Sequence, residues 1–242
     1  MSKRSVIIDI ISVFLIIIMA VSGYKIVVKI IDYKKDSDTY SEIQENLGPD
    51  KSNFINERSL KDENPDYRMW IKIDNTNINY PVVSSSDNEF YLDMDFYRNR
   101  SSSGSIFMDY RNIFEYDKNV ILYGHNMRNG TMFHELENFK DRDFWNKYNK
   151  IRIYRGDYEY VYRPFSVYVS DDNIDNTITH FNGIKDFNKY LDTIQSKSIY
   201  KESSLNEQNS TNSIITLSTC SYEFNDARTI LHAKLIEKNK IK

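Results

Sequence analysis

The amino-acid sequence predicts an α+β protein in which eight strands form a closed or nearly closed sheet, preceded by one transmembrane helix. Three observations predict this class. Eight short segments rich in Ile, Val, Tyr, Phe or Thr are bounded by Asn, Asp, Gly or Ser, as strands usually are. Helical patterns interrupt these segments only a few times. A long apolar stretch stands at the N-terminus.

The N-terminal apolar stretch Val6–Tyr24 follows two basic residues, Lys3 and Arg4. As a helix it would be roughly 28 Å long, about the thickness of the hydrocarbon core of a bilayer. We therefore expect a single-pass anchor with a cytoplasmic N-terminus and the rest of the chain outside the cell, although the lysines after the stretch oppose this orientation. The alternative is a cleaved signal peptide, because Ala20-Val21-Ser22 resembles a small-x-small cleavage site.

Three further segments have helical patterns. The polar segment Ser37–Leu60 is expected to form one helix that stops at Gly48-Pro49 and a second, short helix over Lys51–Leu60. Two inserts between the strands have apolar residues at helical spacing. The first is marked by Met132, Phe133, Leu136 and Phe139, and the second, over Lys185–Ser196, by Phe187, Tyr190, Leu191 and Ile194.

The strands begin near Tyr67, and a tight hairpin turn is expected at Arg155-Gly156-Asp157-Tyr158. The predicted strands are Arg68–Ile73, Asn77–Val83, Ser105–Met108, Asn119–Tyr123, Ile151–Arg155, Tyr158–Ser170, Ser213–Thr219 and Arg228–Glu237. The Asn- and Ser-rich stretch Glu202–Asn212 is expected to be a solvated loop. The chain thus divides into a cytoplasmic tip and membrane anchor (1–31), a helical segment (32–64) and a β-barrel domain (65–242).

Composition excludes several classes of protein. Of the 242 residues, 40% are hydrophobic and 28% are charged, which argues against disorder and against several membrane spans. The formal net charge of −3 offers no basic surplus, so no nucleic-acid partner is predicted. The single cysteine excludes an internal disulfide and a Cys-rich zinc site. That thiol is therefore either a small buried hydrophobe or a reactive nucleophile.

Three residues at the ends of predicted strands suggest a catalytic site. Cys220 ends one strand, Arg228 begins the next, and His125 follows Val120–Tyr123. A thiolate can attack a carbonyl carbon, an imidazole can exchange protons near neutral pH, and a guanidinium can stabilise an oxyanion. Taken singly, each residue also has an ordinary structural interpretation: a buried thiol, a loop histidine such as His134, His180 or His232, and a surface cation.

These residues lie in segments that resemble the sortase family. Thr216-Leu217-Ser218-Thr219-Cys220 resembles the TLxTC signature of that family, with the serine typical of class B. The segments Ala227–Lys234 and Tyr123–Met127 are similar to those around the arginine and histidine of the family. Upstream resemblances to class B are Asn79–Val83, Asp87–Leu92 and Gly104–Asp109. The likeness extends in order from about Tyr67 to Glu237.

The resemblance implies a membrane-anchored cysteine transpeptidase of Gram-positive bacteria, built on an eight-stranded sortase-type β-barrel with N-terminal helices and a helix before the cysteine strand. Cys220 would attack the Thr carbonyl of a C-terminal sorting motif, NPxTN or PxTG-like, on an exported protein. His125 would protonate the leaving amine, an amine of the peptidoglycan precursor would resolve the thioester, and Arg228 would steady the oxyanion. Matching positions nominate three groove-lining residues, which are Asn88, Leu92 and Ser218. Neither a metal nor a cofactor is expected, and Glu223 or Asp226 could supply the acidic residue that some class B members carry after the cysteine.

Two other functions fit the sequence. A membrane-tethered thiol hydrolase would cut the same motif without transfer, because water and amines compete for one thioester. A non-enzymatic β-domain would bind the cell wall or partner proteins and keep Cys220 for packing alone. A papain-like protease is disfavoured, because its cysteine precedes its histidine whereas here His125 precedes Cys220.

Overall fold

The eight predicted strands form a closed barrel in the computed structural model, which describes residues 3–49, 55–147, 149–171, 177–200 and 213–241. The order around the barrel is β1-β2-β3-β4-β7-β8-β6-β5, and β1 and β5 pair to close it. Two neighbouring pairs, β2 with β3 and β4 with β7, are parallel, and the others are antiparallel. The strands are β1 Tyr67–Ile73, β2 Asn79–Val83, β3 Ile106–Met108, β4 Asn119–Tyr123, β5 Ile151–Arg155, β6 Tyr158–Ser170, β7 Ile214–Cys220 and β8 Arg228–Lys240.

Local chemistry explains the turns and irregularities of the barrel. β5 and β6 form the expected hairpin, with Arg155 opposite Tyr158 and Gly156 at φ 58°, a conformation that glycine adopts without strain. The pairing of β6 with β8 shifts register next to Pro164, which has no N–H to donate to a ladder. The extra length of β8 beyond Glu237 pairs with the start of β6.

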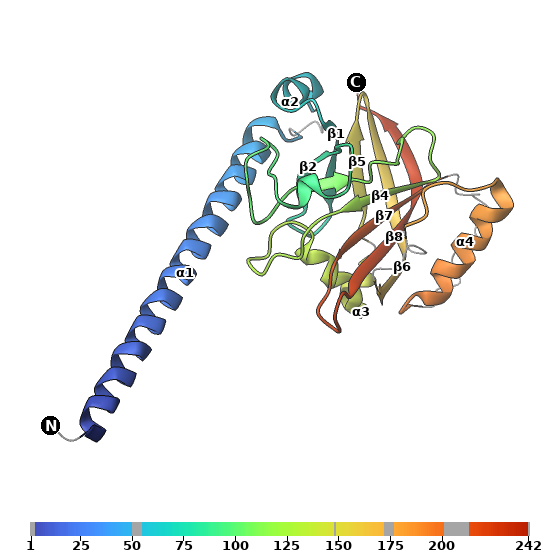
Figure 1. The fold of residues 1–242 in the computed structure, drawn as a ribbon. Coiled ribbons are helices and arrows are strands. Elements are labelled where there is room, and N and C mark those ends of the chain that lie inside the picture. Colours follow the sequence, from blue (N-terminus) through green and yellow to red (C-terminus); the bar gives the residue numbers. More distant parts are fainter. Residues whose placement is uncertain (1–2, 50–54, 148, 172–176, 201–212, 242) are drawn as a thin grey trace.

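Two apolar clusters hold the molecule together. The larger one fills the barrel and includes the fully buried Trp70, Leu122 and Leu217. The smaller one lies between α4 (Ile184–Lys197) and the strands β6, β7 and β8. Figure 1 shows α4 at the right of the barrel. α4 confirms the second predicted insert, and its Phe187 is completely buried in the smaller cluster. Replacing such a phenylalanine with alanine lowers the free energy of unfolding by about 3–5 kcal/mol in a well-packed core.

One continuous helix, α1 (Lys3–Leu47), contains both the apolar stretch and the following polar segment. It ends at the predicted stop before Gly48-Pro49. It holds an 18-residue window of mean hydropathy 2.4 with none of that window buried, which makes it a candidate membrane span. Residue 32, where the sequence-based division places a boundary, lies inside the helix, so the division remains a prediction.

The last turns of α1 lie against the barrel (Figure 1). Tyr40 and Ile43 are buried there, and the Tyr40 hydroxyl donates to the Gly104 carbonyl at 2.7 Å. The Asp36 carboxylate accepts from the backbone N–H of Ser103 at 3.1 Å. Apolar residues on one face of the polar part of α1, together with these hydrogen bonds, therefore attach the helix to the loop that leads into β3.

The remaining helices are short. α2 (Glu57–Glu63) is capped by Asn56, and the predicted start of this helix at Lys51 lies outside the described residues. The first predicted insert is a 3₁₀ helix, η2 (His134–Lys140), followed by α3 (Arg142–Trp145). It begins two residues later than the apolar pattern because Met132 has φ 56° and cannot continue a helix. A 3₁₀ turn, η1 (Phe90–Leu92), precedes β3, and the predicted loop Glu202–Asn212 lies outside the described residues.

Candidate active site

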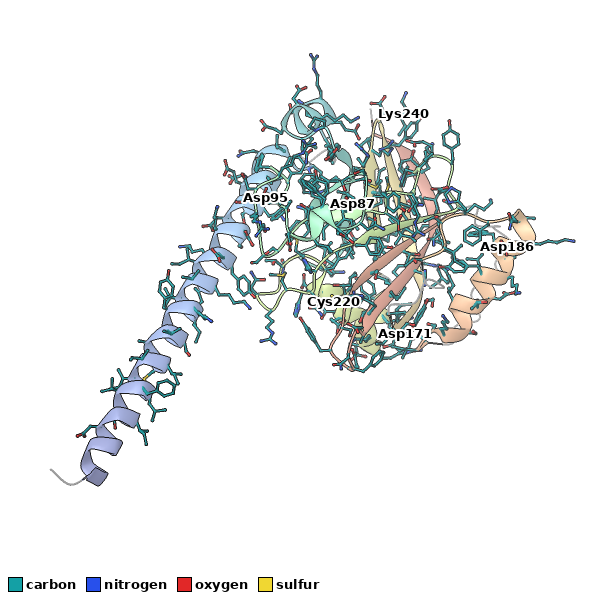
Figure 2. The ribbon with its side chains drawn as sticks, viewed as in Figure 1. Asp87, Asp95, Asp171, Asp186, Cys220 and Lys240 are labelled. Carbon is teal, nitrogen blue, oxygen red and sulfur yellow. The ribbon has the colours of Figure 1, made fainter. Side chains whose placement is uncertain are left out.

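Cys220 and Arg228 face each other across the end of the β7–β8 pair. They are register partners in the antiparallel ladder, and Arg228 Nη1 donates a hydrogen bond to Cys220 Sγ. The six preceding residues of β7 are buried, whereas Cys220 is partly exposed, so the strand delivers its last side chain to the surface. Figure 2 shows Cys220 near the loops at the lower edge of the barrel, at the opposite end from Lys240.

His125 reaches the same place from the loop after β4. The parallel pairing of β4 with β7 sets Tyr123 opposite Ser218, so the next residues along β4 lie beside Thr219 and Cys220. The Thr219 hydroxyl donates to the Gly124 carbonyl at 2.8 Å. A Cβ at residue 124 would collide with the side chains of Ile106 and Phe133, so this close approach requires glycine.

The carbonyl of Leu92 fixes the tautomer of His125. His125 Nε2 lies 2.8 Å from Leu92 O. Because a carbonyl oxygen can only accept, this contact requires a proton on Nε2. Nδ1 is therefore the nitrogen that can gain and lose a proton.

The pKa values of the thiol and the imidazole move toward each other. The pKa of Cys220 is lowered, chiefly by its hydrogen bond with His125 and then by the charge of Arg228, while partial burial opposes the shift. The pKa of His125 is raised, chiefly by Cys220, with a further contribution from the Leu92 carbonyl. The two shifts enlarge the fraction of molecules in which a thiolate and an imidazolium coexist, which is the form able to attack a carbonyl and then protonate a leaving group.

A cleft of about 370 Å³ opens in front of these groups. It is lined by Cys220, His125 and Arg228 together with the three residues nominated for the groove, Asn88, Leu92 and Ser218. The remaining lining residues are Phe107, Tyr123, Gly124 and Thr219. All six nominated residues thus border one cleft, although they come from four separate segments of the chain.

Asn126 was not singled out by the sequence, yet it connects the loop of the histidine to the strand of the cysteine. Its Nδ2 donates to the backbone carbonyl of Cys220 at 2.9 Å. Its Oδ1 lies 2.7 Å from His134 Nδ1, which orients the amide, and its own carbonyl accepts from the Tyr222 hydroxyl at 3.0 Å. The only signal in the sequence was its position directly after His125.

Glu223, one of two acidic residues considered after the cysteine, is held by other partners. Its carboxylate pairs with Lys140 at 2.5 Å and accepts from the Ser221 hydroxyl. Partial burial acts to raise the pKa of Glu223, but the Lys140 ammonium and the Ser221 hydroxyl outweigh it and hold this pKa at about 2. Glu223 is therefore ionised at neutral pH and cannot serve as a proton donor there. Asp226 occupies the loop at φ 61°.

Metal ligands are not grouped in this part of the protein. Among the residues that the structure describes, no three His, Cys, Asp or Glu side chains lie close enough together to hold a metal ion. The absence of a metal stays a prediction of the sequence.

Comparisons with known proteins place the chain among the sortases. The family model of the Sortase domain matches residues 71–236. A sortase B of Staphylococcus aureus is 32% identical over 238 residues, covering 94% of this chain and 96% of the relative. A crystal structure of Clostridium perfringens sortase B superposes with a TM-score of 0.71 at 43% identity, covering 75% of this chain and all of that one. A Staphylococcus aureus sortase B–substrate complex superposes with a TM-score of 0.72 at 30% identity, covering 86% and 99% of the two chains.

Proposed function

The chain belongs to the sortase family, and on that premise we propose that Cys220, His125 and Arg228 carry out the transpeptidation that attaches exported proteins to the cell wall. The observation that carries the proposal is the partly exposed sulfur of Cys220, which interacts with both the guanidinium and the imidazole at the edge of an open cleft. A thiol kept only for packing would need neither partner.

In the first step the Cys220 thiolate attacks the carbonyl carbon of the threonine in a sorting motif, NPxTN or PxTG-like. A C–S bond forms and the carbonyl π electrons move to oxygen. Collapse of this tetrahedral intermediate breaks the C–N bond. His125 gives its Nδ1 proton to the leaving amine, which leaves a thioester on Cys220 and a neutral imidazole.

Arg228 is the donor best placed for the oxyanion. The backbone N–H directly after a nucleophile often fills this role, but here the N–H of Ser221 already donates to Ala227 O at 2.7 Å. A guanidinium has five N–H donors and does not lose its proton, so it can contact the sulfur and still stabilise charge on the adjacent oxygen.

In the second step an amine of the peptidoglycan precursor attacks the thioester. Neutral His125 accepts a proton from this amine, a new amide bond forms, and the thiolate of Cys220 leaves in its original state. Water competes with the amine for the same thioester, so the ratio of transfer to hydrolysis depends on acceptor binding.

The sorting peptide is proposed to lie in the cleft along Asn88, Leu92 and Ser218, with the threonine beside Cys220. α1 would hold the enzyme in the cell membrane as a single span, with the barrel on the extracellular side where exported proteins meet the wall precursor.

The test uses the full-length chain in detergent with fluorogenic peptides carrying NPxTN or PxTG, with and without an acceptor amine. We expect the wild type to cleave a peptide and to ligate it when the amine is present. Cys220→Ala should lower turnover to background, at least about 10³-fold, with an unchanged melting temperature, because it removes one sulfur atom and little else.

Two outcomes would contradict the proposal. Cleavage without ligation under every acceptor amine would favour a thiol hydrolase. Undiminished function of Cys220→Ala would favour a non-enzymatic binding domain.

A further inference from the structure

A completely buried carboxylate, Asp109, lies behind the wall of the cleft, directly after β3. It accepts hydrogen bonds from three side chains and one backbone N–H. Burial acts to raise the pKa of Asp109, but the hydrogen bonds and the charge of Arg111 keep it below its ordinary value. Asp109 is thus a charged carboxylate whose two oxygens both accept hydrogen bonds, and it has no part in the proposed covalent chemistry.

Arg111 supplies the counter-charge in a two-pronged contact. Its Nε donates to Asp109 Oδ1 at 2.8 Å, and its Nη2 donates to Asp109 Oδ2 at 2.7 Å. The same guanidinium donates to the carbonyl of Thr177 at 3.1 Å. The pair therefore fixes the wall of the cleft to the connection between β6 and α4, which is far away in sequence.

Asn88 is oriented by the Asp109 carboxylate and by the backbone N–H of Tyr110. Its Nδ2 donates to Asp109 Oδ2 at 3.0 Å, and its Oδ1 accepts from the backbone N–H of Tyr110 at 3.0 Å. These contacts exclude the flipped amide, because a flip would set N–H against N–H and oxygen against carboxylate. A primary amide has two N–H groups, so one donor of Asn88 remains beyond the bond to Asp109.

Tyr123 is oriented by the same carboxylate. Its hydroxyl donates to Asp109 Oδ2 at 3.0 Å, and its ring stands against Phe107 with 5.3 Å between the centroids. Asn88, Phe107 and Tyr123 all line the cleft. One oxygen atom of Asp109 thus sets the direction of two polar side chains that a bound peptide would meet.

We propose that Asp109 and Arg111 are positioning residues for peptide recognition: Asp109 fixes the side chains of Asn88 and Tyr123, and Asn88 thereby presents an N–H donor to a backbone carbonyl of the substrate. This inference rests on the proposed function, in that the ligand is the sorting peptide. It assigns no part of the covalent chemistry to Asp109, because, in the part of the chain that the structure describes, the carboxylate accepts hydrogen bonds only from Asn88, Arg111 and Tyr123.

The separation of binding from chemistry gives a sharp test, with Asp109→Asn in the full-length chain as the variant. The amide has the same shape but loses the charge and replaces one acceptor oxygen with a donor group, so the orientation of Asn88 and Tyr123 is no longer enforced. We expect KM for the peptide to rise about tenfold with kcat within about threefold, since the lost hydrogen bonds to the charged carboxylate loosen side chains that bind the peptide but leave the reacting groups in place. The rate of Cys220 alkylation by iodoacetamide should keep its pH profile.

The matched control is Asp74→Asn. Asp74 also accepts a two-pronged contact, from Arg152 Nε at 3.0 Å and Nη2 at 3.3 Å, and it does not line the cleft. Both KM and the alkylation profile should stay at the wild-type values. A rise of KM in the control equal to that of Asp109→Asn would overturn the inference, because the effect would then be one of general stability.

Two further variants keep the test decisive. If Asp109→Asn does not fold, Arg111→Lys retains the charge but loses the planar fork, and it should raise KM by a smaller factor. In the Asn88→Ala background, Asp109→Asn should have a clearly reduced effect, since the side chain whose N–H donor it orients is gone and only its effect on Tyr123 remains. Full additivity of the two changes, or a shifted alkylation profile, would overturn the proposal.

The design also separates this inference from the proposed function. Affinity for the peptide can be measured by fluorescence anisotropy in the Cys220→Ala background, with and without Asp109→Asn. Wild-type protein that binds the peptide but does not turn it over would contradict the proposed function alone. Unchanged affinity after Asp109→Asn would contradict the positioning role alone.

Discussion

Two histidines near the strand pair β7–β8 show how differently one side chain can be used. His125 stands at the open end of the pair, beside Cys220, whereas His232 lies on β8 opposite Thr216, four residues along the strand from Arg228. His125 is partly exposed, and His232 is completely buried. The surroundings of the two rings differ in burial and in hydrogen-bond partners, which are the features that decide whether an imidazole binds a proton.

The partners of each ring decide its charge. His125 interacts with the sulfur of Cys220 and with the carbonyl oxygen of Leu92, and both partners favour the protonated ring. The pKa of His125 is therefore raised. His232 is enclosed by hydroxyl groups, with the Tyr168 hydroxyl 3.0 Å from Nε2 and the Thr216 hydroxyl 2.8 Å from Nδ1. Burial lowers the pKa of His232 to about 3, with a smaller contribution from the charge of Lys197. One imidazole therefore exchanges protons, and the other stays neutral and holds strands together.

The largest effect is expected from His125→Gln. Removing the proton donor and acceptor should lower turnover of the peptide about 10³-fold. Because the interaction with His125 lowers the pKa of the thiol, the alkylation profile of Cys220 should also move to higher pH. The melting temperature should change little, since the ring lies at the surface of the cleft. A variant with normal turnover would show that another group carries the proton.

A smaller loss is expected from Arg228→Lys. The ammonium keeps the positive charge but cannot reproduce the planar fork of the guanidinium, so kcat should fall about 10²-fold. Turnover can be measured alongside alkylation to distinguish loss of oxyanion stabilisation from loss of thiolate. Near-normal kcat in the lysine variant would rule out the role given to the guanidinium.

The smallest effect on activity, and a distinct effect on stability, is expected from His232→Gln. The unfolded chain binds a proton on this imidazole near pH 6.5, whereas the folded chain does so only near pH 3. Between these values protonation favours the unfolded state, so His232 lowers the free energy of unfolding by roughly 1.4 kcal/mol for each pH unit of acidification.

Chemical denaturation of the wild type and of His232→Gln between pH 7 and pH 4 checks this point. The wild type should lose stability more steeply than the variant as the pH falls, and the pH profile of turnover should be the same for both proteins. Parallel stability profiles would show that His232 is not the group responsible. A shifted turnover profile would remove the distinction between the two histidines.

The sequence was sufficient for elements whose local pattern decides their structure. All eight strands can be predicted because each is a segment rich in β-branched and aromatic residues with turn residues at its ends. The turn at Gly156 follows from its local sequence alone. The junction inside α1 was not predicted, because no local signal shows whether an anchor and a following helix share one axis. The 3₁₀ form of η2 depends on the backbone of Met132, which the apolar spacing does not reveal.

The candidate site divides in the same way. Cys220, His125 and Arg228 have side chains of distinctive chemistry at the ends of strands, so their residue types and positions are enough to nominate them from the sequence. Asn126 and Asp109 work through contacts with residues far away in sequence, and an amide or a carboxylate at such positions is ordinary. Their roles follow from pairing geometry, which only the folded chain supplies.

Because α1 is one continuous helix, the orientation of the barrel around the helix axis is linked to that of the candidate membrane span. Each residue of a helix adds 1.5 Å and turns the chain by 100°. If α1 spans the membrane as proposed, one residue inserted between Ile31 and Asp36 would therefore rotate the cleft by about 100° around the helix axis and move it by only about 1.5 Å along that axis. In the proposed membrane-anchored enzyme, the number of residues in this part of α1 would set the direction in which the cleft opens.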